Sequence, residues 1–86
     1  MKELEKILKA LANKRRLSIL KYLKQKRESS VGEISEAIKL SFRATSKHLG
    51  VLSSVDIVEK EQKSSQVFYS LSDNQKSVIK TILSLM

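Results

Sequence analysis

The chain has 86 residues, which is enough for one domain and near the size at which a single core is only marginally stabilising. It contains no cysteine and one histidine, which excludes disulfides, a cysteine nucleophile and thiolate metal sites and leaves almost no transition-metal chemistry. Its 17 basic residues outnumber its 9 acidic residues, and the net charge of +8 favours nucleic acid, an anionic membrane or an acidic protein as partner.

The first 25 residues predict two helices. One apolar stripe, with spacings of three and four, runs along the first helix: Leu4, Ile7, Leu8 and Leu11. Asn13 is placed to cap the second helix, and the polar segment 24–30 predicts a loop. Because charges recur every few residues through 1–16, this region is neither a signal peptide nor a membrane span, and we expect a cytoplasmic protein with no membrane partner.

The next segment has the spacing of a helix-turn-helix. Ser30 and Glu33 form the pattern of a capping box, in which the Ser hydroxyl bonds a free N–H and the Glu reaches back. The short helix that follows is interrupted at residues 39–41, where Ser41 can cap a further helix over 42–54. Two short helices joined by a turn of about three residues are typical of this motif.

After Val55 the apolar residues alternate, which predicts two strands at 57–61 and 66–71 joined by a polar hairpin loop. Residues 72–75 resemble a second capping box. A final helix carries another apolar stripe: Val78, Ile79, Ile82, Leu83 and Met86. The predicted fold is therefore mainly α with a β-hairpin (α+β), with four helices, two strands and a last helix in one domain over 1–86.

Winding 42–54 as a helix separates a core face from an outward face. The core face holds Thr45, Leu49 and Leu52. Arg43, Lys47 and Gly50 lie on the opposite side with Ser46 at its edge, and Arg and Lys are the residues that hydrogen-bond guanine in the DNA major groove. Glycine inside a helix costs about 1 kcal/mol against alanine, which close approach to a groove would explain. The alternative is a solvated helix surface.

Four other groups could contact DNA. His48 falls between the faces, so we interpret it as a packed residue with one hydrogen bond or as a phosphate contact, and not as a base. Phe42 leans towards the core, so packing is its first interpretation and base contact its second. The basic run 14–16 begins a helix, where phosphate binds readily, although such runs are usually solvated. The hairpin tip suits the phosphate backbone or minor groove, or is an ordinary polar turn: Lys60, Lys63, Ser64, Ser65 and Gln66.

Three of these segments resemble the ArsR/SmtB-type winged helix-turn-helix repressors. Residues 8–23 (LKALANKRRLSILKYL) are similar to the family's opening helix, and Arg16 stands at the position of the arginine in that family's motif. Ser46–Leu49 followed by Leu52 resembles the recognition-helix pattern, and 67–71 (VFYSL) resembles the second strand of the wing.

The resemblance implies a homodimer held by the first and last helices on a roughly two-fold symmetric DNA operator. The expected DNA contacts are Arg16, Ser41, Arg43, Ser46, Lys47, His48, Gly50, Lys60, Lys63, Ser64, Ser65 and Gln66. The expected dimer contacts are the nine residues of the two apolar stripes. The family's metal sensors place cysteines in the segment matching 30–32 and His/Asp/Glu pairs in the last helix. This chain has Ser and Gly in the first place and no His in the last helix, so we expect neither metal sensing nor a cofactor. Asp56 stands where the family usually has Gly, and Asp tolerates left-handed backbone.

The sequence therefore predicts a sequence-specific, double-stranded DNA-binding transcription regulator that acts as a dimeric repressor. Two alternatives stay open: a winged helix that binds an acidic protein, and a nucleic-acid binder without sequence preference. An enzyme is not expected, because no paired carboxylates, phosphate-binding glycine loop or nucleophile with a base is present.

Overall fold

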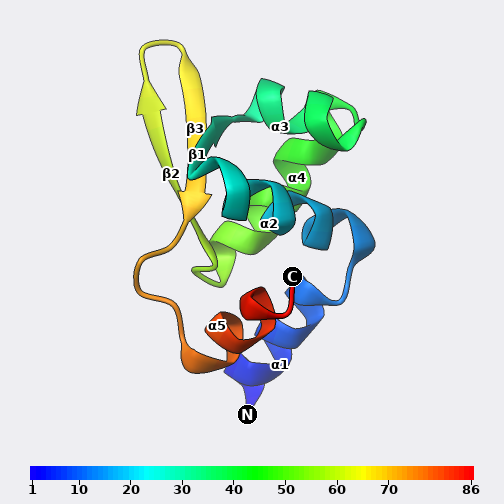
Figure 1. The fold of residues 1–86 in the computed structure, drawn as a ribbon, viewed down its shortest axis with the longest axis vertical. Coiled ribbons are helices and arrows are strands. Elements are labelled where there is room, and N and C mark those ends of the chain that lie inside the picture. The colour runs from blue at the N-terminus through cyan, green and yellow to red at the C-terminus, as the bar shows by residue number, and fades with distance from the viewer.

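The chain forms five helices and a three-stranded antiparallel sheet in a computed structural model that describes residues 1–86 (Figure 1). The elements are α1 (Lys2–Leu11), α2 (Lys14–Lys26), β1 (Glu28–Ser30), α3 (Val31–Ile38), α4 (Phe42–Ser54), β2 (Val58–Lys63), β3 (Gln66–Leu71) and α5 (Ser77–Ser84). The β2–β3 hairpin projects from one end of the molecule, and α1 and α5 lie at the other end. The predicted α+β winged helix-turn-helix is confirmed, with one strand more than expected.

Side-chain caps start the helices where the sequence predicted them. Asn13 Oδ1 accepts hydrogen bonds from the N–H groups of Arg15 and Arg16 at the start of α2. The capping box at Ser30 is complete at the start of α3. Ser41 Oγ accepts from the N–H of Ala44 at 3.1 Å at the start of α4. These short polar side chains satisfy N–H groups that a helix leaves free at its first turn, so the helix starts are encoded locally.

The end of α4 confirms the left-handed turn expected at Asp56. Its φ is 59°, and its N–H donates to the Ser53 carbonyl while the N–H of Ile57 donates to the Leu52 carbonyl, both at 3.1 Å. This pair of bonds is a Schellman motif, which ends the helix and turns the chain into β2.

Strand β1 corrects the prediction of a loop over 24–30. Glu28 pairs with Ser70 and Ser30 pairs with Phe68, so β1 occupies the edge of β3 that β2 leaves free. The sequence Glu-Ser-Ser has neither β-branched residues nor alternation. It becomes a strand because the backbone of β3 supplies hydrogen-bond partners, which a local pattern does not reveal.

Two further boundaries differ from prediction. Ser72 does not cap the last helix: its hydroxyl donates to Glu59 Oε1 at 3.1 Å and accepts from the N–H of Asn74, while α5 starts later, after Lys76. The Ser72 hydroxyl therefore binds Glu59 of β2 and the N–H of Asn74, in the segment between β3 and α5. The hairpin loop is also shorter than expected, because β2 runs to Lys63 and only Ser64 and Ser65 form the turn, with a φ of 56° at Ser64.

The core lies where α2, α3 and α4 pack against one another and against the sheet. The face of α4 predicted to point inward does so, since Thr45, Leu49 and Leu52 are fully buried. Ile19, Leu20, Leu23, Ile34 and Ile57 complete the centre of the core. No helix of the chain is long and apolar enough to cross a lipid bilayer.

The two terminal stripes are divided between the core and the surface. Ile7, Leu11, Ile79 and Leu83 are buried inside the single chain, where they pack against its own core, so their role as dimer contacts stays a prediction. Leu4 and Leu8 are exposed. Three other residues of the stripes are half-buried: Val78, Ile82 and Met86.

Candidate nucleic-acid interface

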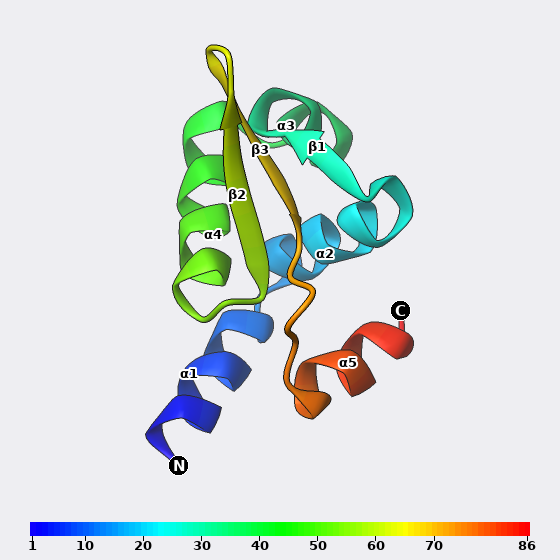
Figure 2. The same cartoon turned by 90° about the vertical axis from the view of Figure 1, so that its left-hand side faces the viewer.

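The outer face of α4 presents two free cations beside a glycine. Arg43 and Lys47 are exposed, and neither forms an ion pair or a side-chain hydrogen bond within the chain. Gly50 is exposed on the same face, and a Cβ built on it would meet nothing within 4 Å. Figure 2 shows α4 running beside β2 of the hairpin. The arrangement leaves charged donors and bare backbone open to a ligand.

No acidic residue lies between Glu36 and Asp56, so α4 and the turn before it carry only positive charge, including Lys39. The surface of α4 is therefore suited to an anion. An exposed cation without an acidic neighbour keeps its attraction for phosphate over roughly a Debye length of about 8 Å at physiological salt.

A cleft of about 390 Å³ separates the start of α3 and the first turn of α4 from the hairpin. Half of the ten residues around it are polar or cationic: Ser30, Ser46, Lys60, Ser65 and Gln66. Two aromatic rings, Phe42 and Tyr69, and two valines, Val31 and Val67, also line it. Lys60 pairs with Tyr69 in the β2–β3 register, and both line this cleft. Hydroxyl, amide and ammonium groups in one place are those that bind phosphate oxygens and base edges.

Phe42 corrects its first interpretation as a packing residue. Its side chain is 61% exposed and is absent from the apolar cluster that forms the core. Winding the helix places Phe42 on the same side as Leu49, but Phe42 is the first residue of α4, where the cleft and not another element stands opposite. A helix position alone does not show where the core ends, so sequence reasoning undervalued this residue.

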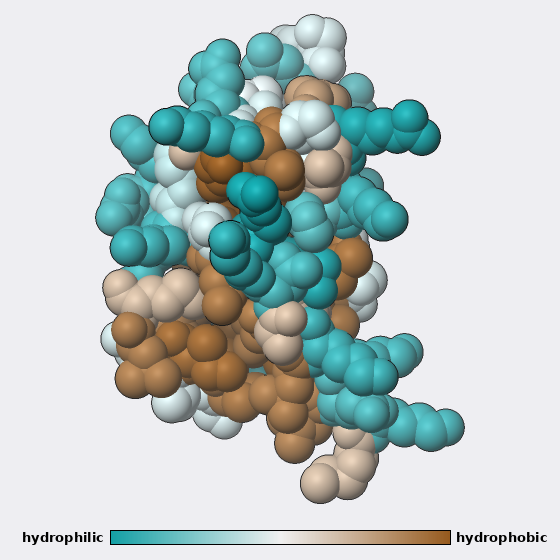
Figure 3. Space-filling view, turned by 90° about the vertical axis from the view of Figure 1, so that its right-hand side faces the viewer, coloured by the Kyte–Doolittle hydropathy of each residue, from teal (hydrophilic) through white to brown (hydrophobic).

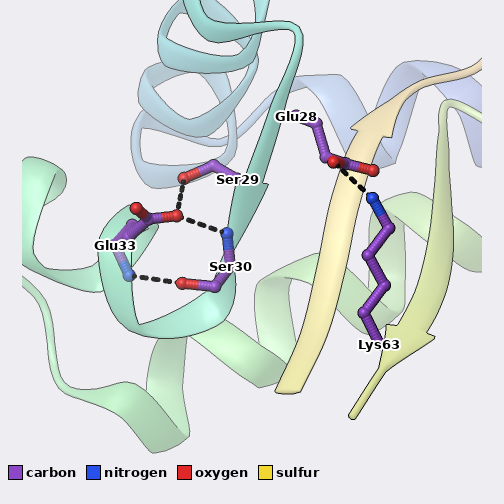
Figure 4. Close-up of polar contacts among 5 residues, drawn as sticks. All are labelled: Glu28, Ser29, Ser30, Glu33 and Lys63. Carbon is purple, nitrogen blue, oxygen red and sulfur yellow. Dashed lines mark hydrogen bonds and ion pairs between the residues drawn. The ribbon is translucent and has the colours of Figure 1, made fainter.

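The hairpin tip does not act as one group, because its two lysines point to opposite faces. Side chains alternate along a strand, so Lys63 lies on the other face of β2 from Lys60. Lys63 Nζ is 2.8 Å from Glu28 Oε1 and 5.3 Å from the centre of the Phe68 ring (Figure 4). The hydrogen bond to Glu28 raises the pKa of Lys63. A phosphate would compete with this carboxylate for the Lys63 ammonium group.

Arg16 forms three hydrogen bonds inside the chain, and its expected DNA contact stays a prediction. Its Nε donates to the Ala10 carbonyl at 2.6 Å and its Nη2 to the Lys9 carbonyl at 3.2 Å, so it caps the C-terminal end of α1. Its Nη1 lies 3.1 Å from His48 Nδ1. A guanidinium has only donors, so Nδ1 of His48 accepts this bond.

His48 sits at the core edge with one hydrogen bond, as the sequence predicted for a packed residue. Burial lowers its pKa, and the charges of Arg16, Lys47 and Arg15 lower it further. A neutral ring keeps Nδ1 free to accept from Arg16. This hydrogen bond joins α4 to α2, so the single histidine has a structural role.

The segment in which the family's metal sensors carry cysteines is used here to build a helix cap (Figure 4). Glu33 Oε1 accepts from the Ser30 N–H at 2.9 Å and from the Ser29 hydroxyl at 3.2 Å, and the Glu33 N–H donates to Ser30 Oγ. Bonds from the Ser30 backbone, the Ser30 hydroxyl and the Ser29 hydroxyl lower the pKa of Glu33. The chain contains no cluster of three His, Cys, Asp or Glu side chains able to hold a metal ion.

A separate apolar surface lies at the end away from the hairpin, over α1 and α5. Met1, Leu4 (37% exposed) and Leu8 (47% exposed) line one groove along α1, and Leu85, which is 80% exposed, follows α5. Figure 3 shows hydrophobic side chains gathered over this lower part of the molecule, whereas the upper part is mostly hydrophilic. We call these four residues the terminal apolar face.

Comparison with known proteins agrees with this geometry. A family model for a helix-turn-helix domain matches residues 11–61. The transcriptional activator HlyU of Vibrio cholerae is 40% identical over 80 residues, covering 93% of this chain and 70% of HlyU. The arsenical resistance operon repressor of Bacillus subtilis is 29% identical over 75 residues, covering 87% of this chain and 71% of the repressor.

Solved structures give the same result. Reduced HlyU from Vibrio cholerae superposes with a TM-score of 0.81 at 38% identity, covering 96% of this chain and 83% of HlyU. The homodimeric winged helix-turn-helix DNA-binding domain Mb0332 of Mycobacterium bovis has a TM-score of 0.83 at 28% identity, covering 98% of this chain and 74% of that one. These proteins are regulators and not enzymes, and the chain belongs with them to the ArsR-type winged helix-turn-helix transcriptional regulators.

Proposed function

We propose that the chain binds double-stranded DNA as a homodimer, recognises a two-fold symmetric operator and represses transcription by occluding a promoter. The observation that carries this proposal is the pair of exposed cations on α4, Arg43 and Lys47, which have no partner inside the chain. Arginine and lysine hydrogen-bond the O6 and N7 atoms of guanine, and each good pair is worth about 1–3 kcal/mol of discrimination.

In this complex α4 lies in the major groove and the hairpin follows the flanking backbone. Lys60 and the hydroxyls around the cleft are placed to bind phosphates beside the groove. Ser41 keeps its hydroxyl in the helix cap but is exposed at the leading end of α4. Two copies of α4 would read half-sites about 34 Å apart, one turn of the duplex, or a multiple of it.

The terminal apolar face supports dimerisation. A chain of 86 residues has a small core, and burying Leu4, Leu8 and Leu85 against a second copy would stabilise it. The related Mb0332 domain is homodimeric. The terminal apolar face lies at the end of the molecule opposite the hairpin, so both copies could keep the first turns of α4 free for DNA.

Repression by occlusion requires only tight binding at a promoter, which the α4 surface supports. The relatives include one named as an activator and one named as a repressor, so the direction of regulation is tested by transcription from a promoter that overlaps the operator. We propose that the protein acts in the cytoplasm, since the relatives it resembles are bacterial transcription regulators.

The decisive experiment selects binding sites for the full chain from a random duplex pool. We expect a two-fold symmetric motif, with affinity lowered about tenfold or more by Arg43→Ala or Lys47→Ala. Lys80→Ala is the matched control, because it removes the same charge from the exposed side of α5, away from the hairpin. Equal binding to selected and random duplexes, or a folded Arg43→Ala/Lys47→Ala variant with unchanged affinity, would overturn the proposal.

A further inference from the structure

We propose that Phe42 is a specificity-determining residue whose ring contacts the C5-methyl group of a thymine in the major groove, once in each half-site. The inference rests on the proposed function and adds to it an apolar contact that the cations of α4 do not make.

The first step is that Phe42 is not part of the apolar core. Its ring is 61% exposed and belongs neither to the core nor to the half-buried apolar side chains packed against the core. The other three aromatic residues are buried or half-buried: Tyr22, Phe68 and Tyr69. An exposed ring that the chain does not pack is available to a ligand.

The second step is the position of the ring. Phe42 is the first residue of α4 and directly precedes Arg43, at the end of the helix that enters deepest when a recognition helix docks. It borders the cleft with Ser46 on its own helix and Lys60 on the hairpin. The side chains that would flank a bound duplex therefore surround the ring.

The third step is the chemistry of the occupant. The cleft combines one exposed ring with an ammonium and several hydroxyls, in a region without acidic residues. An apolar partner would leave those polar groups without hydrogen bonds, which is costly. The major groove supplies phosphates and polar base edges and presents one apolar group, the thymine methyl. Phe42 is the exposed aromatic ring of a cleft that Val31 and Val67 also line, and the thymine methyl is the apolar group that the groove presents to it.

A second copy of the chain does not fit the position. The terminal apolar face lies over α1 and α5, whereas Phe42 lies on the hairpin side of the molecule beside the cleft. The ring is therefore not continuous with the surface that would bury apolar area in a dimer.

The test removes the methyl group without touching hydrogen bonds. Each thymine of the selected operator is replaced in turn by deoxyuridine, and binding by the full chain is measured for wild type, Phe42→Ala and Phe42→Leu. At one symmetry-related pair we expect uracil to weaken wild-type binding about fourfold per methyl and about fifteenfold for both. Phe42→Ala should bind thymine and uracil operators equally. Phe42→Leu, which keeps an apolar contact, should retain part of the difference.

Three outcomes overturn the inference. If a motif is recovered but wild type tolerates uracil at every position, the Phe42 contact is refuted while sequence-specific binding stands. If Phe42→Ala keeps the full preference for thymine, another residue reads the methyl. If Phe42→Ala changes the oligomeric state, the ring belongs to a contact between protein chains. A pool that yields no motif refutes the proposed function and this contact together. Unchanged circular dichroism and thermal melting of Phe42→Ala confirm that the variant is folded.

Discussion

Replacing Gly50 by alanine should make the protein more stable and a poorer DNA binder. Glycine inside a helix is about 1 kcal/mol less favourable than alanine. The added Cβ would meet nothing within 4 Å, so no steric cost offsets this gain. For a chain of 86 residues, a gain of that size corresponds to a rise in melting temperature of about 5 °C.

The DNA-binding effect has the opposite sign. If the backbone at Gly50 lies against the groove, a methyl group there overpacks the interface, and a cost of about 1 kcal/mol, the low end for overpacking, weakens operator binding roughly fivefold. Stability is measured by denaturant unfolding at one fixed protein concentration, because dimerisation would otherwise contribute. Affinity is measured on operator and random duplexes at one salt concentration.

The prediction for stability and the prediction for DNA affinity can be refuted separately. A Gly50→Ala variant that is less stable than wild type would refute the steric reasoning from the free chain. One that is more stable but binds the operator unchanged would show that the groove does not approach this part of α4. Gly32→Ala serves as the stability control, since its Cβ would meet only Ser30 Oγ at 3.9 Å, an ordinary contact in the first turn of α3.

Three further predictions test other parts of the molecule. Leu8→Glu, at a side chain 47% exposed, should leave the fold intact and convert a dimer to monomer in analytical ultracentrifugation, and a variant that stays dimeric would exclude α1 from the interface. Because the pKa of His48 is lowered from 6.5 in the folded state, the unfolded chain binds the proton more readily, so stability should fall as pH drops below about 6.5. Denaturant melts of His48→Gln should lack this part of the pH dependence, and identical curves for both proteins would contradict it. Glu28→Gln should free Lys63 from its 2.8 Å partner, strengthen binding to all duplexes and steepen the salt dependence by about 0.9 per chain, whereas the same change in a Lys63→Gln background should have no such effect.

The features that the sequence predicted well are those decided within a few residues. Asn13, Ser30 and Ser41 cap helices because their acceptors lie two or three residues from the N–H groups they satisfy. The left-handed turn at Asp56 is likewise local. On α4, period and composition sufficed to place Arg43 on the outward face.

The features that it missed depend on segments far apart in the chain. Strand β1 forms because Ser29 pairs with Tyr69 of β3, and the sequence Glu-Ser-Ser by itself does not predict that pairing. Arg16 was expected at DNA because it lies in a basic run, and the sequence did not show that His48, 32 residues away, and the end of α1 accept hydrogen bonds from it. Phe42 was expected to pack because a helical wheel shows which side of a helix a residue lies on, but not whether another element covers that end of the helix.

Arg16 has a consequence for operator choice. One guanidinium holds the end of α1, a helix of the proposed dimer interface, and His48 on α4, the proposed reading helix. In a dimer joined at α1, the separation of the two reading helices would then be transmitted through this side chain. Together with the direct packing of α1 on α4, this side chain would link the proposed dimer interface to the proposed reading helix.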